Sequence, residues 1–302
     1  MGIDQNEDFS VRVNQKKYIE DMVDKFLPGV KVHSICRDTP GTVDQFNKLK
    51  PASSDEERER MRNKPFLQLL GSLLYAGTMS RADIQVYNSV LAKQMQDPSE
   101  DAYELALQVL LYLYKTRDLS LHYNGDCCVE ENLLKNYEFY SGANAKDTVD
   151  RNFGLHAYSD SSWGDTHPVY GYIVRMAGGV ISYCSKNLKS ADSSAEAEYA
   201  AAAHAARELR FIRMLCSELG FEITGDVILG VDNDAAIKVA QNAGVSQRNK
   251  HWDRESHYIR ECVDHGYISM VFVRTAYQLA DCLTKAMDKT GFLNNRKWLF
   301  RS

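Results

Sequence analysis

Four acidic residues in the second half of the chain occupy positions from which their carboxylates could act together. Asp160 and Asp232 each end a run with the pattern of a strand, and Asp281 opens the last expected helix. Glu198 lies near the start of a long expected helix. Ligands of open α/β sheets bind beyond the carboxyl ends of the strands. If the first and fourth strands are adjacent, Asp160 and Asp232 lie side by side at that edge.

The chemistry that such a group could perform is metal-dependent. Carboxylates at close range repel one another unless cations lie between them, and clusters of oxygen ligands suit Mg²⁺, with Mn²⁺ as an alternative. Two such ions about 3.5–4 Å apart promote in-line attack on a phosphodiester. Any one of these aspartates is more simply explained as a turn or helix-cap residue. Four acids at compatible junctions favour a metal site.

Two glutamates compete for one place in this group. The helix expected at 193–219 begins with Ser193 and Glu196 at the spacing of a capping box, which explains Glu196 without a metal. Helical steps from Glu198 follow an apolar stripe that should face a core. A lone charge there is costly unless it points at a cation. The helix face therefore favours Glu198, and the Glu-Ala-Glu repeat leaves Glu196 as the rival.

Strand and helix patterns in the second half predict the sheet that must hold these acids. The order predicts an antiparallel meander of three strands, extended by parallel strands that follow helical crossovers. The expected fold class is α/β, with a mixed sheet. The strands are expected at 154–159, 170–176, 180–185, 226–231 and 268–273, and the helices at 193–219, 234–242, 253–263 and 277–287.

The first half gives a mainly helical pattern. Residues 31–64 are polar and irregular, and residues 124–152 are rich in Asn, Gly, Asp and Lys, which is typical of a linker or a variable loop. Apolar residues at helical spacing predict helices at 15–26, 65–78, 82–95 and 99–114, with short strands at 10–13 and 119–123.

Composition excludes several classes of protein. No apolar run reaches the roughly 18 residues of a membrane span, and the N-terminus lacks the apolar stretch of a signal peptide. The seven cysteines include no Cys-x-x-Cys pair, so neither a disulfide framework nor a zinc site is indicated. We therefore expect an intracellular protein. The net charge of −5 argues mildly against a large basic nucleic-acid surface.

Several motifs, taken together and in order, resemble one known family. The second half contains YSDSSWG, GYIVRMAGGVISYCSKNLKSADSSAEAEYAA, VDNDAAIKVA, RNKHWDRESHYIRE and QLADCLTKAM. This set resembles the ribonuclease H domain of copia-type (pseudovirus) LTR retrotransposon Pol polyproteins. Upstream, NQKKYIEDMVDKF and the segment from LLGSLLYAG to LSLHY resemble the end of the reverse transcriptase and the connection that precedes this domain.

The resemblance implies an architecture. We expect a mainly helical reverse-transcriptase thumb and connection remnant at 1–123 and a linker at 124–152. A ribonuclease H-like domain, with a mixed five-stranded sheet flanked by helices, would occupy 153–290, and a C-terminal tail 291–302.

The resemblance also implies an activity. Asp160, Glu198, Asp232 and Asp281 would be the catalytic, metal-binding carboxylates, holding two Mg²⁺ ions. The reaction would be endonucleolytic cleavage of the RNA strand of RNA–DNA hybrids during retrotransposon replication. The expected partners are the hybrid and the remainder of the Pol polyprotein, with no membrane, in a cytoplasmic particle or the nucleus. The chain contains no Asp-Asp pair, so polymerase activity is not expected.

Substrate contacts are expected around the acids. Asn233 either donates to a 2′-hydroxyl or caps the following helix, and His251 either replaces a histidine that many relatives carry before the last aspartate or bonds near Asp253. Trp163 is more simply a core residue than a stacking platform. The expected substrate-binding residues are Asn233, Arg248, Lys250, His251 and Lys186, with Lys189 and Arg254 as further phosphate contacts.

Two other functions compete with this interpretation. A non-catalytic nucleic-acid-binding or structural fragment of a degenerate retroelement is favoured by the short 166–170 segment, where the family commonly has a basic stretch, and by the acidic net charge. A DNA-directed nuclease or integrase of the same fold is the other alternative. Integrases typically carry a glutamate on the last helix, and Asp281 argues against that class.

Overall fold

The chain folds into two compact units. In a computed structural model, the first unit contains residues 1–122 and 285–302, and the second contains residues 123–284. The structure describes residues 1–126, 129–141, 144, 148–149, 151–163, 169–188, 191, 193–241 and 253–300. None of the helices in these described ranges is both long enough and apolar enough to cross a membrane.

The first unit is mainly helical, as its sequence pattern predicts. Its core forms where apolar faces of α1, α4 and α6 meet, and Leu69, Leu73 and Val109 are fully buried there. A small sheet has the strand order β1-β2-β3. The helices are α1 (Lys16–Phe26), η1 (Val32–Ser34), α2 (Val43–Lys48), α3 (Asp55–Arg62), α4 (Phe66–Met79), η2 (Ala82–Ile84), α5 (Gln85–Ala92), α6 (Glu100–Lys115) and α13 (Lys289–Leu299), and the strands are β1 (Gly2–Gln5), β2 (Val11–Asn14) and β3 (Leu121–Tyr123).

The end of the chain differs from the expected tail at 291–302. Helix α13 belongs to the first unit, where Phe292 is 3% exposed and packs edge-on against Tyr112, with ring centroids 5.6 Å apart. The buried Arg81 guanidinium, which binds Asp83, also lies over the ring of Phe300. These apolar and aromatic contacts join segments far apart in sequence, so they were not visible as a local pattern.

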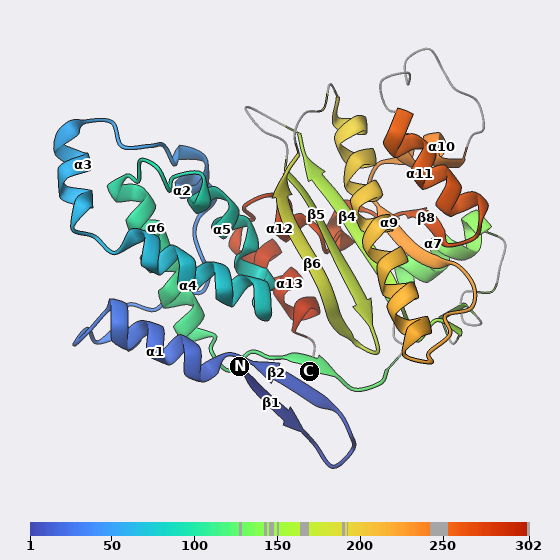
Figure 1. Ribbon diagram of the computed structural model, residues 1–302, viewed down its shortest axis with the longest axis horizontal. Helices are drawn as coiled ribbons and strands as arrows, with labels where there is room; N and C mark the ends of the chain where they lie inside the picture. Colours follow the sequence, from blue (N-terminus) through green and yellow to red (C-terminus); the bar gives the residue numbers. More distant parts are fainter. Residues whose placement is uncertain are drawn as a thin grey trace. The chain divides into compact units, whose positions relative to one another are not determined.

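The second unit contains the mixed five-stranded α/β sheet that the sequence predicts (Figure 1). The strands are β4 (His156–Ser162), β5 (Val169–Met176), β6 (Gly179–Asn187), β7 (Val227–Val231) and β8 (Ile268–Phe272). Their order is β6-β5-β4-β7-β8. Strands β4, β5 and β6 form an antiparallel meander, whereas β7 and β8 are parallel to β4.

Helices cover both faces of this sheet. Side chains alternate along a strand, so Leu229 and Val231 face the α9 side, whereas Gly230 faces Leu133 of α7. Helix α9 (Ser194–Glu218) packs on β4, β5 and β7 and is joined there by α10 (Asp234–Gln241) and α11 (Asp253–Asp264). The opposite face carries α7 (Glu131–Ser141) and the short α12 (Asp281–Thr284), which follows η4 (Thr275–Tyr277).

Helix α9 has the start, the buried face and the end that its sequence predicts. The Ser193 side chain accepts a hydrogen bond from the backbone N–H of Glu196 at 3.2 Å. Seven of its eight alanines are buried, and their small side chains let the helix lie close to the sheet. Gly220 has a φ of +83° and ends the helix in the conformation that glycine adopts most readily.

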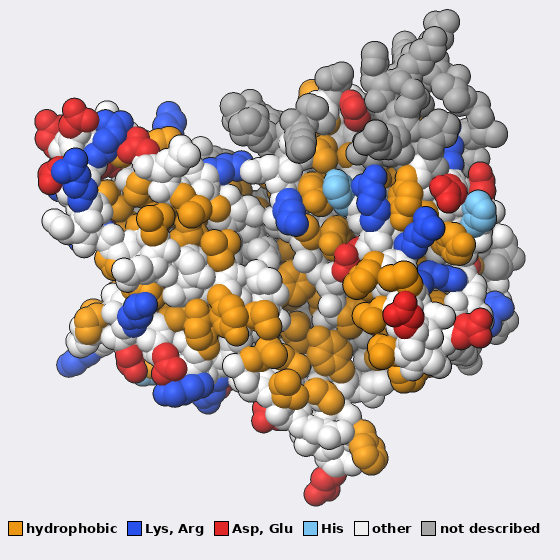
Figure 2. All heavy atoms as spheres, in the orientation of Figure 1, with side chains coloured by type: hydrophobic (Ala, Val, Ile, Leu, Met, Phe, Trp, Pro, Cys, Tyr) orange, Lys and Arg blue, Asp and Glu red, His pale blue; other side chains and the backbone are white. Residues whose placement is uncertain are grey.

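The exposed side of α9 carries arginines among apolar side chains (Figure 2). Arg207 lies over the ring of Tyr258, and Arg210 and Arg213 lie over the ring of Tyr267. Cation–π contacts of this kind hold guanidinium groups against aromatic faces. These arginines therefore serve packing on this side of the unit.

The segment expected to be a linker, residues 124–152, instead forms part of the second unit. Glu130 is buried, and its carboxylate accepts hydrogen bonds from Tyr158 and from Arg175, the latter at 2.6 Å. His156 Nε2 lies 3.2 Å from the same carboxylate. The polar composition of this segment predicted a loop. One of its polar residues, Glu130, instead pairs with buried groups of the sheet.

We expect Glu130→Gln to lower the free energy of unfolding by about 3 kcal/mol at pH 7, because it leaves the buried Arg175 without its counter-charge. Burial alone raises the pKa of Glu130, but His156, Arg175 and Tyr158 outweigh it and lower the pKa to about 2, from an ordinary 4.5. The carboxylate's contribution is therefore complete above pH 4.5 and is lost as the pH falls toward 2.

Urea unfolding of the full chain from pH 7 to pH 3 checks this expectation, with hydrogen exchange reporting β4 separately. The difference in the free energy of unfolding between wild type and Glu130→Gln should become smaller as the pH falls. Glu131→Gln is the matched control, because Glu131 is exposed and pairs only with Lys135 of its own helix among the pairs found in the described chain. Equal stability of Glu130→Gln and wild type at pH 7 would contradict the assignment.

Candidate metal centre

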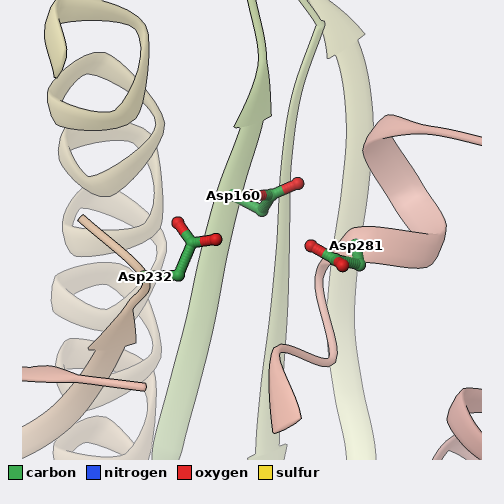
Figure 3. A group of neighbouring side chains, drawn as sticks. All are labelled: Asp160, Asp232 and Asp281. Carbon is green, nitrogen blue, oxygen red and sulfur yellow. The ribbon is translucent and has the colours of Figure 1, made fainter. Parts of the chain in front are cut away.

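Three of the four expected carboxylates come together in the structure. Asp160, Asp232 and Asp281 each offer one oxygen, and these three atoms lie within 4.8 Å of one another. Asp160 is 2% exposed and Asp281 is 3% exposed. Figure 3 shows Asp160 between the other two, whose carboxylates converge on it. An oxygen-only group of this kind has the donor chemistry of a site for a hard divalent cation.

The register of the sheet sets the positions of Asp160 and Asp232. Strands β4 and β7 are adjacent and parallel, and Ser159 pairs with Val231. The next residues in each chain segment, Asp160 and Asp232, therefore lie at the same level. The sequence pattern placed Asp160 at the end of its strand. In the structure it lies inside β4, because β4 continues to Ser162 through pairing with β5. Asp232 does follow the end of β7.

Asp281 reaches the group on a short turn of helix. The helix expected at 277–287 is not continuous, since Gln278 is extended between η4 and α12. Gly171 of β5 pairs with Asp160. A Cβ atom on Gly171 would lie 2.7 Å from Leu283 Cβ and 3.0 Å from Thr284 Cγ2. The missing side chain therefore lets α12 lie directly on the sheet beside Asp160.

Glu198 lies beside the three aspartates but outside their group. It is 6% exposed, and its Oε1 accepts hydrogen bonds from the Ser161 backbone N–H at 3.1 Å and hydroxyl at 2.8 Å. Its Oε2 is buried, and no described residue gives it a hydrogen bond. A buried acceptor of this kind needs a partner. A cation between Glu198 and the aspartates would supply one.

The pKa of Glu198 also indicates that its carboxylate lacks a cation partner among the described residues. Burial first, and then the charges of Asp160 and Asp232, raise its pKa to about 9, although the hydrogen bonds from Ser161 act in the opposite direction. The rival, Glu196, is only half buried, and its backbone N–H serves the cap of α9. We therefore propose Glu198, rather than Glu196, as the fourth carboxylate of the site.

The expected substrate-binding residues are described only in part. Arg248, Lys250 and His251 lie outside the described residues, as does Lys189. Lys186 is exposed on β6, one position along from the Gly171–Ser185 pair. Asn233 caps α10, since its Oδ1 accepts from the N–H groups of Ala235 at 3.0 Å and Ala236 at 3.2 Å.

Four residues near the carboxylates were missed or misjudged from the sequence. Trp163 is 53% exposed rather than part of a core, and its indole N–H donates to the Ala191 carbonyl at 3.1 Å. Ser161, Gln278 and Thr284 hydrogen-bond to the acids or to the strand that carries them. Their only sequence signal is that each is polar and lies within three residues of an acid, which is too common to be selective.

The chain is similar to curated Pol polyproteins of retrotransposons. It is 28% identical over 282 residues to the "Retrovirus-related Pol polyprotein from transposon TNT 1-94" of Nicotiana tabacum. It is 33% identical over 231 residues to the "Retrovirus-related Pol polyprotein from transposon RE2" of Arabidopsis thaliana. These alignments cover 93% and 75% of this chain. The chain is a relative of copia-type retrotransposon Pol polyproteins.

This relationship confirms the resemblance that the motifs indicated. The chain spans only 19% and 14% of the length of these two Pol polyproteins. No family model matches the chain. Among solved structures, the ribonuclease H1 of Halobacterium salinarum matches with 22% identity and a TM-score of 0.34, over 43% of this chain and 92% of that one. The second unit has the mixed five-stranded sheet, flanked by helices, that the resemblance implies.

We expect Gly171→Ala to weaken the second unit by about 1–3 kcal/mol, because the added methyl must displace α12 from the sheet. Thermal unfolding measures the change. Gly71→Ala is the control, since a Cβ at Gly71 in the middle of α4 meets no atom within 4 Å and should be neutral or slightly stabilising. An unchanged midpoint for Gly171→Ala would mean that α12 does not depend on this close approach.

Glu198→Gln should leave the metal-free protein at least as stable as wild type, because it removes a buried acid that two nearby aspartates repel. The same change should reduce the rise in melting temperature that Mn²⁺ or Mg²⁺ produces, since a ligand that binds only the folded state stabilises it. Thermal unfolding in EDTA measures the stability of the metal-free protein, and thermal unfolding with each ion measures the rise in melting temperature. Glu196→Gln is the matched control, and an equal loss there would restore Glu196 as the ligand.

Proposed function

We propose that the second unit is a ribonuclease H-type endonuclease that cleaves the RNA strand of RNA–DNA hybrids, as part of retrotransposon replication. The observation that carries this proposal is the convergence of Asp160, Asp232 and Asp281, with the buried Glu198 beside them, on a ribonuclease H-like sheet. The Pol relatives supply the replication context, and they are whole polyproteins of which this chain matches a small part.

The four acids would hold two Mg²⁺ ions, with Mn²⁺ as an alternative. Bound ions of this kind supply an activated water and stabilise the oxygen that leaves phosphorus. The residues of the chain orient that chemistry. Asp160 is fixed by its strand and lies between its neighbours, so it would be one of the residues that hold the ions. Glu198 would contribute the buried Oε2 that lacks a described partner.

Recognition of the hybrid would depend on its backbone. RNA–DNA hybrids are distinguished by their shape and their 2′-hydroxyl groups more than by base edges. Lys186 is exposed and available for a phosphate contact, and Arg248, Lys250 and His251 remain predicted contacts. Asn233 is committed to the cap of α10 through its Oδ1. The proposed partners are therefore the hybrid and the remainder of a Pol polyprotein, within the cell, and polymerase activity is not part of the proposal.

The competing function is a binding or structural fragment that does not cleave. The net charge of −5 favours it, because the 41 acidic residues outnumber the 36 basic ones and the chain as a whole repels a polyanion. Binding of the hybrid measured against salt concentration separates the two functions from each other. A salt-dependent affinity without hydrolysis would support the non-catalytic fragment.

Asp232→Asn should reduce hydrolysis of a labelled RNA–DNA hybrid in Mg²⁺ by at least about 100-fold, because a metal ligand is worth several kcal/mol in the transition state. The variant should remain folded, since Asp232 is only half buried and its described hydrogen bond is a long 3.4 Å contact from Thr275. Asp264→Asn, at an exposed position that ends α11, is the control that keeps activity. Equal cleavage by Asp232→Asn and wild type, or no cleavage by wild type, would refute the proposal.

A further inference from the structure

The turn that carries Asp281 is attached to the strand of Asp160 at both of its ends. Before the turn, Gln278 is 1% exposed, and its Nε2 donates to the carbonyl of Ser159 at 3.0 Å. Its Oε1 accepts from the N–H of Ala280 at 3.2 Å. At the end of the turn, Thr284 is 2% exposed, and its hydroxyl donates to the Asp160 carboxylate. The same hydroxyl lies 3.1 Å from the carbonyl of Asp281.

These attachments matter because α12 cannot position itself. It has only four residues, and a single helical turn is unstable without contacts from the rest of the protein. The strand, by contrast, is paired on both sides. Two buried polar side chains thus connect the short helix α12 to the stable strand β4. Loss of either hydrogen bond would leave a buried polar group without a partner, which lowers stability.

We infer that Gln278 and Thr284 are positioning residues of the metal centre, which hold Asp281 and the Asp160 carboxylate in the arrangement that binds a divalent cation. The inference rests on the proposed function for the identity of the site. It assigns neither residue to the ligands, because neither belongs to the group of three carboxylates. Thr284 orients Asp160 directly, and Gln278 sets where the turn begins.

Two substitutions of Thr284 separate the effect of its hydroxyl group from the effect of its volume. Thr284→Val keeps the shape that packs near Gly171 but cannot donate to Asp160. Thr284→Ser keeps the donor and loses the methyl group. A residue with only a packing role should tolerate valine better than serine, whereas a positioning residue should show the reverse order.

The decisive measurement is Mn²⁺ binding to the full chain without substrate, by electron paramagnetic resonance or calorimetry. We expect Thr284→Val to weaken Mn²⁺ binding by about 10–100-fold, the usual effect of losing a group that orients a ligand. Thr284→Ser should stay within about threefold of wild type. Thr224→Val, at an exposed loop position, is the matched control and should bind like wild type. Gln278→Met, of similar length but without a donor, should weaken binding in the same direction.

Hydrolysis of the hybrid then distinguishes this inference from the proposed function. The valine variant should need a higher Mn²⁺ concentration for half-maximal cleavage, with little change in KM for the hybrid. Wild-type affinity in Thr284→Val and Gln278→Met would overturn the inference even if wild type cleaves. If wild type binds Mn²⁺ but does not cleave, the order of the variants in metal binding still decides the inference. If wild type binds no Mn²⁺, both fail. Should Thr284→Val not fold, Gln278→Met and Thr284→Ser carry the test.

Discussion

The repulsion among buried carboxylates is the constraint on which the second unit depends. Asp160, Asp232 and Asp281 offer oxygens within 4.8 Å of one another. Burial raises the pKa of Glu198, and the charges of Asp160 and Asp232 raise it further. Such a group separates if its supports give way. The structure opposes that tendency with backbone geometry: two adjacent parallel strands, a long helix capped at Ser193, and a turn that lies on Gly171.

The parts of this arrangement that the sequence predicts are those with strong local patterns. Five short apolar runs and one long amphipathic helix predict the mixed sheet and α9, because strand and helix periodicities are properties of neighbouring residues. The order of the elements then makes β4 and β7 neighbours, and the register of these strands brings Asp160 beside Asp232. The preference for Glu198 over Glu196, which stays a prediction, also comes from a local property, the face of the helix.

The parts that the sequence does not predict depend on contacts between distant residues. Glu130 lies in a polar segment with the composition of a linker, and its buried partner Arg175 is 45 residues away. Helix α13 stands where a tail was expected, because Phe292 packs on Tyr112. The glycine at position 171 has no special backbone conformation to mark it. Its role appears only when α12 is seen against the strand.

Charge connects the metal centre to the substrate that we propose for it. When all four acids are ionised, as metal ligands must be, they carry a formal charge of −4, and the whole chain carries −5. A phosphate backbone is repelled by such a site when it holds no cation. Two divalent cations would bring the four acids to neutrality and the chain to a formal charge of −1. Metal binding and polyanion binding are then coupled, because each favours the same state of the site. On our inference, the contacts of Gln278 and Thr284 hold the carboxylates in the arrangement that binds the cations. The bound cations would then remove the repulsion that would exclude the nucleic acid.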